Sequence, residues 1–264
     1  MTSSMLSRPV QTRSEHALLE TIDSTIRAAC LSKGFVEQWY PTLIDRHSLD
    51  DAGYREAFPH LLCDVAIGDQ ASSWCLSPAV CYHTFIALRG ACLAPQTKIT
   101  ARNHCYRNEQ EIIPGRRQIE FEMRELVVVG SETWIEDQLV RWEQQIGLVA
   151  RRFGIVASWK AAADPFFLPT SKGKALMQRL LKTKQEYCLS DGLAITSINR
   201  HRDYFANRFS IRTVTGLPVH SACIAFGLDR WVCAAGQARN ADNANIADIA
   251  VNDQNGFGNH QKRS

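Results

Sequence analysis

The sequence has no apolar run that approaches the ~20 residues needed by a membrane-spanning helix. Its N-terminus lacks an apolar core of roughly 7–15 residues, so it does not resemble an export leader. The sequence also has little excess of either charge, because 30 lysines and arginines and 27 acidic residues leave a net charge of +3. So weak a bias does not by itself indicate a nucleic-acid partner. We therefore expect a cytoplasmic protein that is not bound to a membrane.

The sequence also lacks the cysteine spacing of a disulfide framework or of a compact metal-binding motif. Nine cysteines are present, but the number is odd and no CxxC pair occurs. Without an export leader, reduced thiols are expected. Any metal site would have to bring cysteines together from distant segments.

Internal repeats and long linkers are absent, and 264 residues with 45% hydrophobic content suit a globular chain. Apolar periodicity predicts helices at 14–34, 79–90, 132–154 and 171–187, and strands at 35–45, 58–68, 97–109, 119–131, 192–199 and 209–216. A strand enters a helix over 219–238. This order predicts an α+β fold built on an antiparallel sheet. We expect a flexible N-terminus (1–14), one catalytic domain (15–236) and a flexible tail (237–264).

Two segments carry residues suited to nucleotide chemistry. Arg107 and Glu109 alternate on one face of a strand, and Phe121 lies on the strand that returns from the turn. A guanidinium, a carboxylate and a ring can hold an α-phosphate and sandwich a purine. In the second segment, AFGLDRW, Gly227 ends a strand and Arg230 enters a helix. Taken alone, each segment fits a plainer interpretation, a surface hairpin with ion pairs and a helix start with one exposed arginine.

Together the two segments resemble motifs 2 and 3 of the class II aminoacyl-tRNA synthetases, and residues 34–41, which end at Pro41, resemble motif 1. Residues 76–83, 115–130, 195–211 and 220–231 are similar to the atypical, zinc-dependent seryl-tRNA synthetases. They are more similar still to the truncated relatives of those enzymes, the amino acid:carrier protein ligases. The resemblance covers roughly residues 15–235. It implies a class II aminoacyl-tRNA synthetase-like antiparallel sheet flanked by helices, and a homodimer formed through motif 1.

The resemblance implies a zinc site at Cys81, Glu125 and Cys223. Three protein ligands leave one position of a tetrahedron open, which is the catalytic pattern and can take the α-amino group of an amino acid. The alternative is that two buried cysteines and a paired glutamate are unrelated. Cys75 and Cys233 lie near the same segments but do not match the positions of the family.

The same resemblance assigns the nucleotide contacts. Arg107 and Arg230 are the expected catalytic groups: Arg107 at the α-phosphate, and Arg230 over adenine and toward the γ-phosphate. Glu109 is expected at the adenine amino group and Phe121 against the ring. Further residues, expected near phosphates bound to Mg²⁺, are Ser197 and Asn199. The sequence departs from the synthetase pattern where that pattern has a Mg²⁺-binding Glu, because it has Leu193 and Ala194 there.

The acceptor is expected to be a carrier protein and not tRNA. Only about forty residues precede Pro41, and no anticodon-binding domain is expected after motif 3. Carrier proteins are acidic, so a basic docking face is expected. The exposed face of the predicted helix at 171–187 offers Lys172, Lys174, Arg179, Lys182 and Lys184. The alternative is an ordinary solvated helix.

The sequence therefore predicts an ATP-dependent ligase. It would activate a small amino acid, glycine or alanine, as an aminoacyl-adenylate and pass it to the phosphopantetheine thiol of a carrier protein. One alternative is a synthetase paralogue that acts on tRNA or a small-molecule amine. Another is a catalytically inactive binding module, against which the joint presence of all the site residues argues.

Overall fold

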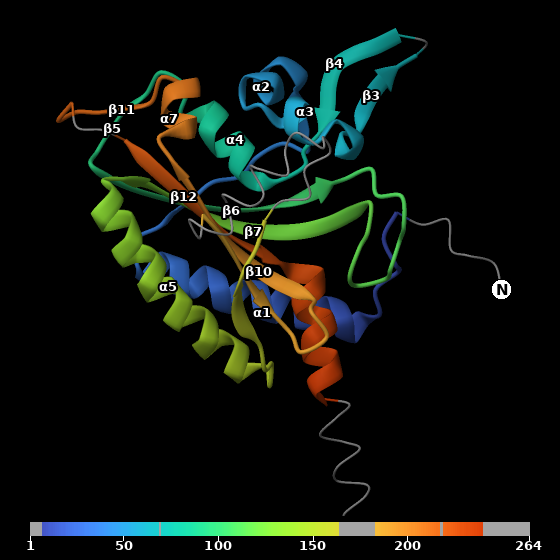
Figure 1. The fold of residues 1–264 in the computed structure, drawn as a ribbon. Helices are drawn as coiled ribbons and strands as arrows, with labels where there is room; N and C mark the ends of the chain where they lie inside the picture. Colours follow the sequence, from blue (N-terminus) through green and yellow to red (C-terminus); the bar gives the residue numbers. More distant parts are fainter. Residues whose placement is uncertain (1–6, 69, 164–182, 217–218, 240–264) are drawn as a thin grey trace, which may run out of the picture.

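A computed structural model describes residues 7–68, 70–163, 183–216 and 219–239. Its centre is a seven-stranded sheet with the order β1-β6-β7-β12-β10-β9-β8 (Figure 1). Every neighbouring pair is antiparallel except β1 and β6, which are parallel. The strands are β1 (Val36–Glu37), β6 (Gln96–Tyr106), β7 (Glu120–Gly130), β8 (Ser158–Ala161), β9 (Lys184–Cys188), β10 (Ala194–Arg202) and β12 (His220–Gly227). The predicted α+β fold with an antiparallel sheet is confirmed.

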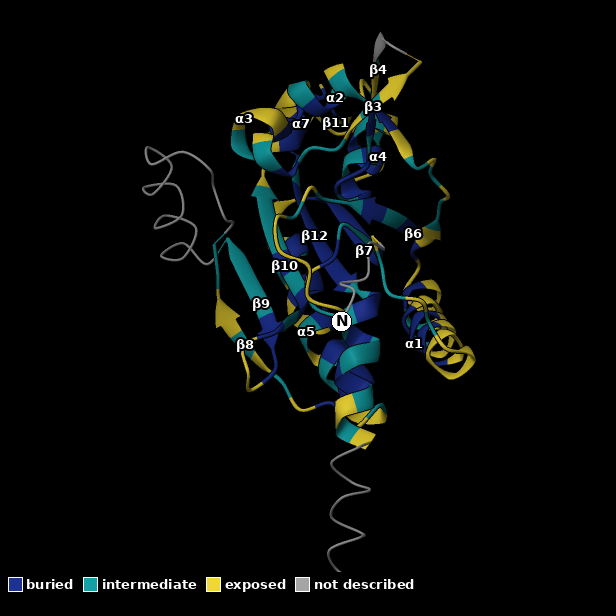
Figure 2. Ribbon diagram, turned by 90° about the vertical axis from the view of Figure 1, so that its right-hand side faces the viewer, coloured by how far each residue is buried: buried dark blue, intermediate teal, exposed yellow. Residues whose placement is uncertain are grey.

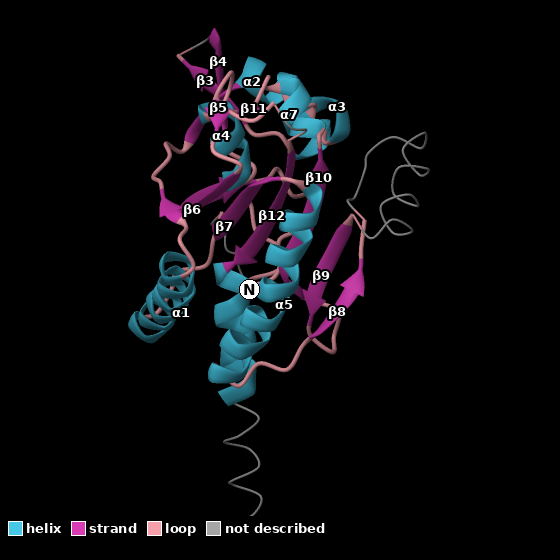
Figure 3. Cartoon of the chain, turned by 90° about the vertical axis from the view of Figure 1, so that its left-hand side faces the viewer, coloured by secondary structure: helices cyan, strands magenta, loops and turns pink. Residues whose placement is uncertain are grey.

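Helices cover both faces of this sheet. Three lie on one face, namely α1 (Arg13–Ser32), α5 (Glu132–Arg152) and helical residues 228–239 (Figures 1 and 3). On the other face lie α4 (Val80–Ala87) and α7 (Tyr204–Arg208). Side chains of β7 alternate between the two layers, Leu126 and Val128 toward the first and Val127 and Val129 toward the second. This explains why β7 is buried from Glu122 to Gly130 and why the centre of the sheet is mostly dark blue in Figure 2.

Local sequence signals account for where the long helices begin. Thr12 caps α1 in a capping box with Glu15, in which each side chain binds the backbone of the other residue. Ser131 caps α5 by accepting a hydrogen bond from the Trp134 amide at 3.4 Å. Apolar side chains at helical spacing then face the sheet, as predicted for both segments.

A smaller layer lies over α4. It contains a three-stranded sheet of order β2-β4-β3 and a two-stranded pair, β5 with β11. Its elements are β2 (Leu43–Asp45), α2 (Arg46–Asp51), α3 (Tyr54–Ala57), η1 (Pro59–Leu61), β3 (Asp64–Ile67), β4 (Gln70–Leu76), β5 (Cys92–Leu93) and β11 (Arg212–Thr213). This layer closes one side of the cavity described below.

Several predicted elements differ from the structure. The strand predicted at 35–45 is two short strands, β1 and β2, and the one predicted at 58–68 contains η1 before β3. The strand predicted at 209–216 is wrong over most of its length, since only Arg212–Thr213 form a strand and α7 precedes them. Most of the helix predicted at 171–187 lies outside the described residues, but its end is wrong, because Lys184–Cys188 form β9. Residues 185–188 pair with both β8 and β10, so cross-strand hydrogen bonds there prevail over the helical pattern. No helix among the described residues is long and apolar enough to cross a membrane.

Trp142 offers a direct test of the packing between α5 and the sheet. It is 1% exposed and meets Phe35 and Phe226 at ring-centroid distances of 5.6 and 6.4 Å. Replacing it with alanine is expected to lower the free energy of unfolding by about 3–5 kcal/mol, measured by urea denaturation. The control on the same helix is Val140→Ala, because Val140 is 52% exposed and should cost below about 0.5 kcal/mol. Equal costs for the two variants would contradict this packing.

Candidate active site

One cavity of about 590 Å³ collects the residues predicted for nucleotide and metal binding. They come from α4, from the β6–β7 hairpin, and from β10, β12 and the helix that follows β12. The predicted residues at its wall are Cys81, Arg107, Glu109, Phe121, Glu125, Ser197, Asn199, Cys223 and Arg230. Because segments far apart in sequence converge here, the cavity is the candidate active site.

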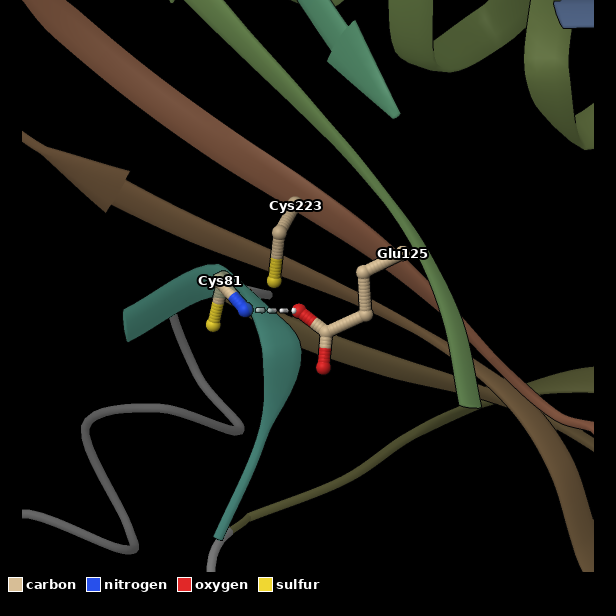
Figure 4. A group of neighbouring side chains, drawn as sticks. All are labelled: Cys81, Glu125 and Cys223. Carbon is tan, nitrogen blue, oxygen red and sulfur yellow. Dashed lines mark hydrogen bonds between the residues drawn. The ribbon is translucent and has the colours of Figure 1, made fainter. Parts of the chain in front are cut away.

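At the base of the cavity, Cys81, Glu125 and Cys223 form a compact cluster (Figure 4). One potential ligand atom from each residue lies within 4.8 Å of the others. All three residues are buried. Register explains the juxtaposition: Glu125 lies opposite Ala225, so Cys223 is a diagonal neighbour on the same face of the adjacent strand. Cys81 comes from the first turn of α4.

Glu125 also takes the place of a helix cap. The N-cap residue Ala79 has no side chain that could cap α4. Instead the Glu125 carboxylate accepts hydrogen bonds from the amides of Cys81 at 2.9 Å and Val80 at 3.3 Å. The helix start favours a negative charge at this point. The same contacts fix the carboxylate next to the two sulfur atoms.

The electrostatics of the cluster are those of a cation site. Burial raises the pKa of the Glu125 carboxyl to about 8. A hydrogen bond between the two thiols raises the pKa of Cys81 and lowers the pKa of Cys223. A buried carboxylate and two buried thiolates repel one another unless a cation joins them. Two sulfur ligands and one oxygen ligand fit Zn²⁺ in its catalytic, three-ligand form.

In the part of the cavity predicted to bind the nucleotide, the cationic side chain of Arg107 lies over the aromatic ring of Phe121. The Arg107 guanidinium lies 5.1 Å from the Phe121 ring centroid, and its Nε donates to the carbonyl of Pro78 at 3.2 Å. Glu109 lies 3.7 Å from Arg117 on the turn of the hairpin. These contacts hold a guanidinium, an aromatic ring and a carboxylate at one wall. The prediction that Arg107 and Glu109 alternate along a strand is wrong, because β6 ends at Tyr106 and the Glu109 amide turns back to the Arg107 carbonyl at 2.7 Å.

Arg230 is held by backbone groups on two sides. Its Nε donates to the carbonyl of Arg116 and its Nη1 to the carbonyl of Ala194, both at 2.8 Å. Burial, and next the guanidinium of Arg107, lower the pKa of Arg230. Two guanidinium groups held in place at one wall form a site that favours a bound anion.

Asn199 lies closer to the Cys/Glu/Cys cluster than its predicted phosphate role suggests. It faces Cys223 across β10 and β12, and its Nδ2 is 3.5 Å from the Cys223 Sγ. The same amide donates to the Ser197 hydroxyl at 3.3 Å. Asn199 therefore adds a hydrogen bond to a sulfur of the Cys/Glu/Cys cluster, a contact that orients a ligand.

Only one of the five residues predicted to dock a carrier protein is described by the structure. Lys172, Lys174, Arg179 and Lys182 lie outside the described residues. Lys184 is described, and its prediction as part of an exposed helical face is wrong. It lies in β9 at the cavity wall, its side chain is 12% exposed, and it forms an ion pair with Glu186 at 3.2 Å.

Sequence reasoning missed an aromatic end of the cavity. Tyr54 and Phe58 from the α3 region meet Tyr82 of α4 and Tyr204 and Phe205 of α7 there. Tyr54 and Tyr82 are in edge contact, with ring centroids 5.3 Å apart. No spacing in the sequence joins these three segments, so only the tertiary fold reveals this wall.

No family model matches the chain. Two curated proteins of Bradyrhizobium diazoefficiens are similar to it. Amino acid–acyl-carrier-protein ligase 2 is 31% identical over 244 residues, which span 81% of this chain and 72% of the relative. Amino acid–acyl-carrier-protein ligase 1 is 29% identical over 225 residues, or 74% and 69% of the two chains.

Solved structures resemble the fold at low sequence identity. The M. kandleri SerRS, in complex with A. aeolicus tRNASec, has a TM-score of 0.75 at 17% identity, covering 89% of this chain and 54% of that one. The Giardia lamblia prolyl-tRNA synthetase, in complex with prolyl-adenylate, has a TM-score of 0.73 at 14% identity, covering 88% and 48%. The chain thus spans about half the length of these synthetases. The likeness establishes a class II synthetase-like fold.

Proposed function

Because the chain belongs to the amino acid–acyl-carrier-protein ligases, we propose that it activates glycine or alanine with ATP at a zinc site. The aminoacyl group then passes to the phosphopantetheine thiol of a carrier protein. The observation that carries the proposal is that one cavity holds both the Cys/Glu/Cys cluster and the pair of fixed arginines. The cluster suits an amine, and the arginines suit a polyphosphate.

The amino acid would lie at the base of the cavity. Cys81, Glu125 and Cys223 would hold the zinc ion, which when bound by three protein ligands offers an open position to an α-amino group. That contact would leave the amino-acid carboxylate free to face Arg107. The small size proposed for the substrate rests on the resemblance to the family.

Adenylation needs positioning and charge neutralisation more than proton transfer. The amino-acid carboxylate is already ionised, so it attacks the α-phosphorus of ATP directly while the bond to pyrophosphate breaks. Arg107 would stabilise the charge that develops on the α-phosphate, and Arg230 that on the leaving pyrophosphate. Phe121 would stack on one face of adenine and Arg230 would cover the other, while Glu109 would accept a hydrogen bond from the adenine amino group. Mg²⁺ would accompany the ATP phosphates.

In the second half-reaction, a thiol attacks the carbonyl carbon of the aminoacyl-adenylate. A thioester forms, the bond to AMP breaks, and the thiol proton is lost to solvent or phosphate. We propose a carrier-protein thiol as the acceptor because both curated relatives carry that acceptor in their names.

Amino-acid-dependent ATP–pyrophosphate exchange tests the first half-reaction. A panel of amino acids with the purified chain should give exchange with glycine or alanine, and metal analysis should give about one zinc per chain. Parallel charging reactions with a phosphopantetheinylated carrier protein and with tRNA identify the acceptor. Zinc without exchange would indicate a chain that has lost its substrate. The absence of both zinc and exchange would contradict the proposal.

We further propose a homodimer formed through β1. This strand pairs only with β6 among the described residues, and nearby Val36 and Trp39 are 62% and 78% exposed. Exposed apolar side chains beside an open strand edge favour association. Sedimentation at micromolar concentration should give about twice 29.7 kDa, and Trp39→Glu should give a monomer. Trp74→Glu, on β4 and 41% exposed, is the control and should stay dimeric. A wild-type monomer would refute this assembly.

A further inference from the structure

The segment before α1 contacts the outer end of the β6–β7 hairpin. In Figure 1 this segment, coloured dark blue, runs beside the hairpin. The carbonyl of Ser7 accepts from the amide of Glu120 at 3.3 Å, and the Ser7 hydroxyl donates to the Glu120 carboxylate at 3.1 Å. These contacts bring the next residue, Arg8, against two buried carboxylates.

Arg8 joins β7 to the helix that follows β12. Its Nη1 lies 2.8 Å from the Glu122 carboxylate, and its Nη2 lies 2.7 Å from the Asp229 carboxylate. The three side chains are 14%, 7% and 8% exposed, so solvent screens these ion pairs little. The other oxygen of Asp229 accepts from the Glu122 amide at 2.7 Å. Arg8, Glu122 and Asp229 thus form one three-residue clamp.

The clamp lies at the edge of the nucleotide part of the cavity. Glu122 follows Phe121 on β7, and Arg102 also donates to its carboxylate at 2.7 Å. Glu122 and Asp229 both border the cavity, whereas Arg8 is not among its lining residues. Asp229 directly precedes Arg230. Arg8 therefore contacts neither substrate nor reacting atoms, but it fixes the neighbours of the two residues proposed to sandwich adenine.

We propose that Arg8 is a positioning residue of the ATP site, and that its clamp on Glu122 and Asp229 sets the spacing between Phe121 and Arg230. The proposal rests on the proposed function for its link to ATP. Among the described residues, Arg8 is the only cation within 4.0 Å of Asp229. Without it, the buried Asp229 carboxylate loses this cation and faces Glu122, which keeps its contact with Arg102, and the backbone contact between β7 and the helix loosens.

Hydrogen exchange in the absence of substrate tests the clamp itself. In Arg8→Ala, peptides that cover 119–124 and 226–232 should exchange faster than in the wild type, while peptides of α5 should not change. Arg13→Ala is the matched control, because Arg13 is exposed at the start of α1, just after the segment that holds Arg8. Unchanged exchange at both sites in a folded Arg8→Ala variant would overturn the proposal.

Kinetics test the link to ATP. In Arg8→Ala the KM for ATP should rise about tenfold. A misplacement of about 1 Å at an active site can lower the rate by about a hundredfold, and Arg8 acts one residue away from the ATP contacts. The KM for the amino acid should stay within about twofold, and added ethylguanidinium should restore part of the loss. A lower active fraction with an unchanged KM for ATP would mean that Arg8 only stabilises the fold, and would overturn the proposal. If the wild type shows no exchange with any amino acid, the proposed function fails, while the hydrogen-exchange result still decides the clamp.

Discussion

Replacing Cys223 with alanine is expected to abolish zinc binding and amino-acid-dependent ATP–pyrophosphate exchange together. The change removes one sulfur from a buried cluster and leaves Cys81 and Glu125, two ligands where a catalytic zinc site needs three. Without the ion the amino acid would lose the amine contact proposed for it. A loss of several kcal/mol in binding and orientation corresponds to about 10³-fold or more in rate.

The measurement combines metal analysis of the purified variant with the exchange assay. Cys105→Ala is the matched control, since Cys105 is a fully buried thiol on β6 that is no part of the cluster. It should keep about one zinc per chain and most of the activity. Thermal unfolding of both variants checks that the fold survives. If the Cys223→Ala protein kept its full zinc content, Cys223 would not be a zinc ligand.

The chemistry of the site was predictable because strand alternation is a local property. Once residues 97–109 and 119–131 pair as a hairpin, Phe121 and Glu125 share a face, as they do in the structure. Strand alternation alone could not predict Cys223 as the third ligand. Cys223 lies beside Glu125 because of the β7–β12 register, and only the resemblance to a family pointed to that pairing.

Other features depend on contacts that no sequence pattern records. The Arg8–Asp229 ion pair joins residues 221 positions apart, so the segment expected to be loose gave no sign of a role. Lys184 stands in a run of lysines that suggests a solvated helix, yet the residues after it pair with both β8 and β10. In both cases tertiary contacts determine a structure that composition alone misrepresents.

Replacing Arg107 with alanine is the second change for which a large effect is expected. The guanidinium is held by the Pro78 carbonyl and lies over the Phe121 ring, so it is fixed before any substrate binds. A charge held in place stabilises the transition state without reorganising. Removing one such donor costs about 10²–10³-fold in the rate of exchange. Zinc content should not change, because Arg107 is no ligand of the Cys/Glu/Cys cluster.

Arg107→Lys separates charge from shape. Lysine keeps the positive charge but lacks the planar fork that matches two phosphate oxygens, so it should recover only part of the activity. Arg89→Ala is the control, because Arg89 is 44% exposed and pairs with Asp51 on the surface at 2.7 Å. Exchange kinetics at saturating amino acid should show the loss in kcat/KM for ATP. If Arg107→Ala retained wild-type exchange, the α-phosphate contact would have to come from another group at the cavity wall. Arg230, which is half-buried there and held by two backbone carbonyls, would be the next residue to replace.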